Sequence, residues 1–150
     1  MSRATSEMRS IAKSLIALEK PRRKSSVAKT AAAFRAVEKL RPHLANLMGG
    51  GGFHALLGRS LALASAEISW LGAVRVKTDG TFEGLEEARA RLDPAEFLEG
   101  GIVLMAQLLG LLVALVGPSL TSRLVGEVWP KFESTMWNST GGEVQDEKAK

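Results

Sequence analysis

The sequence predicts an all-α protein, a compact helical bundle around one central apolar helix with at most one short β-hairpin. Three observations support this fold class. The 23 residues from Gly100 to Ser122 carry no formal charge. Apolar residues elsewhere mostly recur at helical spacing, and only one short stretch alternates with period two. Aromatic residues make up 5% of the 150 residues, with no Tyr, so the core has to rest on Leu, Ala and Val.

The first predicted helix covers residues 5–19. Its apolar face consists of Met8, Ile11, Ala12, Leu15 and Ile16. Pro21 and the like charges that follow it break the helix and indicate an exposed hinge. We therefore expect residues 1–26 to be mobile, residues 27–133 to form the bundle domain and residues 134–150 to form a disordered tail.

Two further helices are predicted on either side of a glycine run. The first covers about 27–48, and Pro42 is expected to kink or divide it at Arg41. Gly49 to Gly52 should end it and form a flexible connection. The second covers about 53–71. Residues 73–77 then alternate before Thr78-Asp79-Gly80-Thr81, which predicts a single short hairpin.

The central helix has the clearest predicted start. A short acidic helix at 85–92 precedes it. Asp93 is a good N-cap, Pro94 suits the first helical position and Glu96 completes a capping-box pattern, so the central helix is assigned to 94–117. Gly117-Pro118 should interrupt the apolar run. A last amphipathic segment then presents Leu120, Leu124 and Val128 as far as Trp129.

The charge is unevenly distributed along the chain. Residues 1–41 contain 11 Lys and Arg against 3 acidic residues, a net charge of +8, while residues 42–150 contain 9 against 13, a net of −4. This basic N-terminus suggests an acidic partner. The residues that we expect to contact an anion or a lipid headgroup are Lys13, Lys20, Arg22, Arg23, Lys24 and Lys29.

No pattern in the chain predicts catalysis, a metal site or a cofactor. Cys is absent, and the two histidines, His43 and His54, have no metal-binding spacing. The glycine run lacks the Gly-Lys-Ser/Thr ending of a phosphate loop. The acidic residues Glu86, Glu87, Glu96 and Glu99 are expected to form a solvated face. We therefore expect neither enzymatic activity nor a small-molecule substrate.

The all-round apolar character of residues 102–116 leaves two roles open. In the favoured interpretation this helix is the core of a cytoplasmic, non-enzymatic interaction or regulatory protein that associates with itself or with a protein partner. Small residues at helical spacing and aromatic residues near the C-terminus are the candidates for helix packing or self-association. They are Ala106, Gly110, Ala114, Trp129, Phe132 and Trp137.

In the alternative interpretation the 101–117 helix inserts into a bilayer while the basic N-terminus docks on anionic lipid. The protein would then be peripheral to the membrane or inserted in it. Nucleic-acid binding by the basic N-terminus is disfavoured, because residues 1–33 contain no aromatic side chain for stacking on bases.

The stretch from about 40 to 130 includes RPHLANLMGGGGFHALLGRSLALASAE, VRVKTDGTFEGLE and QLLGLLVALVGPSLTSRLVGEVWP. This pattern resembles small all-helical bacterial proteins of unassigned function. The resemblance implies a bacterial cytosolic setting and an all-helical fold, and it implies no activity. It does not include the basic N-terminus.

Overall fold

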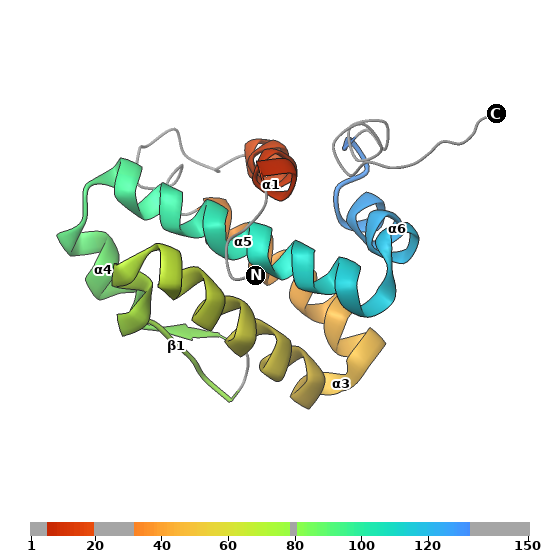
Figure 1. The fold of residues 1–150 in the computed structure, drawn as a ribbon, viewed down its shortest axis with the longest axis horizontal. Coiled ribbons are helices and arrows are strands. Elements are labelled where there is room, and N and C mark those ends of the chain that lie inside the picture. The colour runs from red at the N-terminus through yellow and green to blue at the C-terminus, as the bar shows by residue number, and fades with distance from the viewer. Residues whose placement is uncertain (1–5, 20–31, 79–80, 133–150) are drawn as a thin grey trace.

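The computed structural model of the chain describes residues 6–19, 32–78 and 81–132. These residues form five α-helices, one short 3-10 helix and a two-stranded antiparallel sheet. Figure 1 shows the helices packed around one helix, α5, which runs through the middle of the structure. The predicted fold class, a compact all-α bundle with a central apolar helix, is therefore confirmed.

Helix α5 spans Pro94–Val116, as the capping pattern predicts. The Asp93 carboxylate accepts a hydrogen bond from the Ala95 backbone N–H at 3.2 Å, and Pro94 occupies the first turn. Every residue from Gly100 to Leu109 is buried. The helix ends at Gly117, whose positive φ of 91° favours glycine, and α6 (Pro118–Val128) begins directly after it.

Helix α3 spans Ala32–Glu67 and joins the two helices that were predicted separately. The predicted division of the helix at Arg41 is wrong, since Pro42 lies inside α3. Pro42 is exposed, while Leu40 and Leu44 on either side of it are fully buried and hold the backbone in place. The flexible connection predicted for Gly49 to Gly52 is also shorter than expected. Only Gly49 leaves the helical conformation (φ 82°, ψ 161°), so the glycine run forms a bend.

The predicted hairpin and the short helix after it are present. Following the 3-10 helix η1 (Ser69–Ala73), strand β1 (Arg75–Val76) pairs antiparallel with β2 (Phe82–Glu83). Helix α4 (Leu85–Arg91) leads from the hairpin towards α5. Phe82 packs edge-on against Phe34 of α3, with ring centroids 5.7 Å apart, and this contact ties the hairpin to the core.

Helix α1 (Ser6–Leu18) buries the predicted side chains Ile11, Ala12, Leu15 and Ile16 in the same core as α3 and α5. The sequence assigned this helix to a segment separate from the bundle, whereas in the structure it is one of the bundle's helices. Its apolar face fits against α5, and leaving that face in water would cost free energy. The predicted hinge and C-terminal tail lie outside the described residues.

The apolar stripe predicted for the last segment is rotated in the structure. Thr121 and Val125 are the buried residues of α6, while Leu120 is exposed and Leu124 and Val128 are partly buried. The break at Gly117 sets the rotation of α6 independently of α5. Thr121 can be buried because its hydroxyl donates a hydrogen bond to the Gly117 carbonyl oxygen at 2.8 Å.

Two glycines allow close packing against the N-terminal half of α5. A Cβ atom added at Gly101 would lie 2.3 Å from the Ala33 Cβ, and one added at Gly100 would lie 2.2 Å from the Trp70 ring. Trp70 in turn stacks on Phe97, with ring centroids 5.5 Å apart. The tightest approaches to α5 therefore lie at Gly100 and Gly101, upstream of the small residues singled out in the sequence.

We expect Gly101→Ala to destabilise the fold by about 1–3 kcal/mol, because the added methyl group has no room against α3. Gly58→Ala is the matched control, since a Cβ at this helical position of α3 meets open space. That change should be neutral or stabilise by up to about 1 kcal/mol. Urea unfolding of the two variants measures the difference, and equal stabilities would contradict the close approach.

Candidate interaction surface

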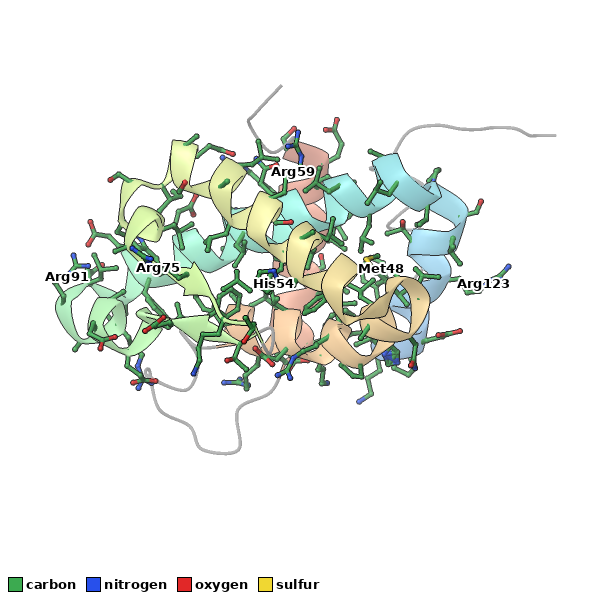
Figure 2. All side chains as sticks on the ribbon, turned by 90° about the horizontal axis from the view of Figure 1, so that it is seen from below. Met48, His54, Arg59, Arg75, Arg91 and Arg123 are labelled. Carbon is green, nitrogen blue, oxygen red and sulfur yellow. The ribbon has the colours of Figure 1, made fainter. Side chains whose placement is uncertain are left out.

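Three large apolar side chains are exposed among the described residues. They are Leu47 (44%), Leu115 (65%) and Leu120 (36%). Leu47 lies just before the bend of α3, and the other two flank the junction between α5 and α6. Both places lie at the same end of the bundle, where Figure 2 marks Met48 and Arg123. We call these three residues the apolar end.

The apolar end lies in segments that lack charge. Neither 42–58, around the bend of α3, nor 100–122, across the end of α5, contains Lys, Arg, Asp or Glu. Gly49, Gly50 and Gly51 at the bend are exposed, and a Cβ at any of them would meet no atom within 4 Å. Another protein surface could therefore approach the backbone closely here.

The predicted packing residues are distributed between the core and the surface. Ala106 is fully buried, Gly110 is partly buried and Ala114 is exposed. Trp129 and Phe132 are buried in the chain's own core rather than exposed as anchors for a partner. Trp137 lies outside the described residues.

Of the predicted anion-contacting residues, the structure describes Lys13 alone, which is exposed on α1. The remaining five lie outside the described residues. They are Lys20, Arg22, Arg23, Lys24 and Lys29.

An ion-pair cluster that the sequence did not predict joins α1, α3 and α5. Arg9 pairs with Glu67 of α3 and, at 3.3 Å, with Glu99 of α5. The Glu67 side chain is only 5% exposed, and it also accepts a hydrogen bond from the Gln107 amide nitrogen at 3.1 Å. Glu99 was expected to belong to a solvated acidic face. Its side chain is 46% exposed, and it also pairs with Arg9, a contact that the sequence did not predict.

A second cluster lies at the C-terminal end of α1. The buried Glu19 carboxylate pairs with Lys39 at 2.8 Å and accepts a hydrogen bond from the Trp129 indole nitrogen, also at 2.8 Å. These contacts connect α1 with α3 and with the segment after α6. Sequence spacing gives no signal for this cluster, because Glu19 and Trp129 are 110 residues apart.

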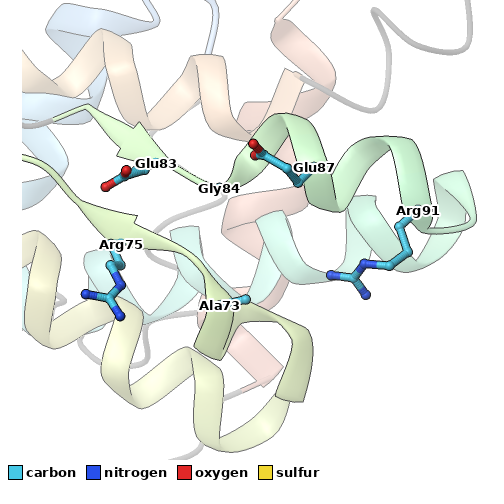
Figure 3. A pocket seen from close by; sticks show the side chains of 6 residues that line it. All are labelled: Ala73, Arg75, Glu83, Gly84, Glu87 and Arg91. Carbon is cyan, nitrogen blue, oxygen red and sulfur yellow. The ribbon is translucent and has the colours of Figure 1, made fainter.

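The cavity at the opposite end of the molecule, beside α4, has a volume of 410 Å³ (Figure 3). Its charged lining residues are Arg75, Glu83, Glu87 and Arg91, all of which are exposed. Arg75 faces Glu83 across the hairpin ladder. Exposed charges of both signs are well solvated and screened, so this lining offers no desolvated group to activate a substrate.

The described residues contain no group of three His, Asp or Glu side chains that could hold a metal ion. His54 is engaged with the backbone, its Nε2 atom lying 3.3 Å from the Val76 carbonyl oxygen. The arrangement with the clearest physical consequence is therefore the exposed apolar end.

Comparison with known proteins adds no relative. No protein-family model matches the chain, and neither the curated proteins nor the solved structures contain a match.

We expect Glu19→Gln to destabilise the fold by about 1–2 kcal/mol, because the change removes the charge from a buried carboxylate that has two partners. Glu127→Gln removes the same charge from an exposed position on α6 and should change stability by less than about 0.5 kcal/mol. Thermal unfolding of both variants tests this. Similar losses would show that the Glu19 contacts contribute nothing specific.

Proposed function

We propose that this protein is a non-enzymatic interaction protein that self-associates through its apolar end. The observation that carries the proposal is the exposure of Leu115. Leu115 belongs to the same helix in which every residue from Gly100 to Leu109 is buried, yet 65% of its surface faces solvent. Leu47 and Leu120 are exposed in segments at the same end of the bundle, and exposed apolar side chains in one region of a surface are typical of binding sites.

The lack of charge within the segments that carry the apolar end favours a second copy of the chain as the partner, and the charge nearest to it in sequence is the exposed Arg123. A two-fold symmetric interface brings each surface against its own copy, so any charge near its centre would meet a like charge. The neutral segments 42–58 and 100–122 avoid this repulsion. The exposed glycines at the bend of α3 would allow the two copies to pack closely.

Membrane association is a second candidate, and one observation favours it. Among the described residues, α5 is long and apolar enough to cross a bilayer. However, 61% of its most apolar stretch is buried inside the bundle, so spanning a bilayer would require the surrounding helices to separate from it. Self-association uses only the part of α5 that is already exposed.

We expect Leu115→Glu to raise the dissociation constant of the homo-oligomer by at least about 100-fold, because a buried carboxylate at the interface would lack a partner. Ala90→Glu adds the same charge to an exposed position on α4, at the opposite end of the bundle, and should leave association unchanged. Sedimentation equilibrium over a range of concentrations measures both. A monomer at every concentration, or an unchanged constant for Leu115→Glu, would refute the proposal.

We expect the purified chain to stay at the bottom of a density gradient when mixed with vesicles, whether these are zwitterionic or contain anionic lipid. The reason is that most of α5 is covered by its own bundle. If the protein floats, Lys13→Glu, which reverses an exposed charge on α1, distinguishes docking of the N-terminus on lipid from insertion of α5 into the bilayer. Flotation that this variant abolishes would support docking of the basic N-terminus on anionic lipid, whereas flotation that it leaves intact would support insertion of α5.

A further inference from the structure

We propose that α1 is a displaceable cover of α5, and that its displacement enlarges the surface through which two copies of the chain associate. The inference rests on the proposed function, because it assigns the uncovered surface to a second copy. It adds a regulatory contact, since the docked α1 would limit self-association.

Helix α1 lies across one face of α5. The Cγ atom of Met8 is 3.9 Å from the position of a Cβ at Gly110, while Arg9 reaches Glu99 on the same helix. Glu99 and Gly110 are eleven residues apart, or about three turns, and therefore share a face. Figure 1 shows α1 end-on where α5 runs across the view, so α1 crosses this face.

The cations in the polar contacts of α1 are partly exposed, whereas the hydrogen bond between Glu19 and the Trp129 indole is buried. Arg9 and Lys39 provide the cations of the two clusters, and their side chains are 31% and 50% exposed. When Arg9 leaves, Glu67 keeps its hydrogen bond from Gln107, so the carboxylate that stays behind in the bundle retains a donor. Such pairs fix the position of a helix more than they add to its stability.

The contact between α3 and α5 is more extensive than that of α1, because α3 contributes eleven buried apolar side chains to the core and α1 contributes four. There, the backbone of α5 at Gly101 approaches Ala33 so closely that no methyl group fits between them. Separating these helices would forfeit dense apolar packing without any compensation from water. The weaker attachment of α1 predicts that it opens before the rest of the bundle does.

Displacement of α1 would join its binding face on α5 to the apolar end. Gly110 lies under Met8, and Ala114, four residues further on, lies on the same face and is already exposed. Leu115 lies in the same last turn of α5 but projects about 100° around the helix from Ala114. The uncovered face would therefore border the apolar end, and a second copy that wraps around the end of α5 could cover both.

The absence of Cys allows a direct test, because a single engineered thiol is the only reactive one. Ala12→Cys on α1 and Ala64→Cys on α3 are matched variants, since both alanines lie in helices and are fully buried. We expect a thiol reagent to label Ala12→Cys at least about 100-fold faster than Ala64→Cys in native buffer, with a weaker dependence on urea. Equal rates and equal urea dependence would show that α1 leaves only on global unfolding, and would overturn the proposal.

A reversible disulfide between α1 and α5 tests whether the docked α1 limits self-association. In Met8→Cys/Gly110→Cys a disulfide would tie α1 to α5, at the place where the Met8 Cγ atom lies 3.9 Å from a Cβ at Gly110. Sedimentation equilibrium should give a dissociation constant at least about tenfold higher for the oxidised form than for the reduced form of the same protein. Arg9→Ala should lower the dissociation constant of the oligomer, because it removes the ion pairs that hold α1 in place. Lys13→Ala, on the exposed face of α1, should leave the dissociation constant unchanged.

The outcomes separate this inference from the proposed function. Equal association of the oxidised and reduced forms would overturn the role of α1 as a cover and leave self-association standing. If neither form associates while the labelling rates still differ, the proposed function fails and displacement of α1 stands.

Discussion

The structure depends on the need to surround α5 with protein. A helix that is apolar on every side loses free energy wherever it faces water, so helices must cover it from several directions. Helices α1, α3, α4 and α6 supply that cover, together with Trp70 of the 3-10 helix, which stacks on Phe97. Gly100 and Gly101 let two of these elements come close to the α5 backbone, which places the densest packing at the N-terminal half of the helix.

The length of α5 explains where this cover ends. Its 23 residues extend for about 34 Å, whereas α1 has 13 residues and crosses α5 instead of running along it. At the C-terminal end of α5 the chain turns back through Gly117, and α3 bends at Gly49. The last turn of α5 is therefore only partly covered, with Ala114 and Leu115 exposed, and the proposed interface follows from this incomplete cover.

The buried carboxylates have a different role from the apolar core. Glu19 and Glu67 both lie where α1 meets the rest of the molecule, and each accepts from two side chains. Burying charge is costly, so these pairs add little net stability but specify one position for α1. These contacts add to the four apolar side chains that α1 buries in the core, so release of α1 exposes apolar surface as well as breaking ion pairs.

Local chemistry allowed several elements to be predicted. The Asp93 cap, the glycine–proline break after α5, the hairpin and the apolar face of α1 each depend on neighbouring residues, and the structure contains all four. The predictions for Pro42 and the glycine run were wrong because they rested on local propensity alone. Propensity favours a break at these positions, but the buried leucines on either side of Pro42 favour one continuous helix.

The sequence by itself determined the helical class and the apolar helix at the centre, because helical periodicity and charge-free length are properties of contiguous residues. Only the tertiary structure decided that Arg9 meets Glu67, that Trp129 is buried against Glu19 and that Leu115 faces solvent. These outcomes depend on how distant helices lie relative to one another. That arrangement follows from packing between surfaces, and the spacing of residues along one helix does not specify it.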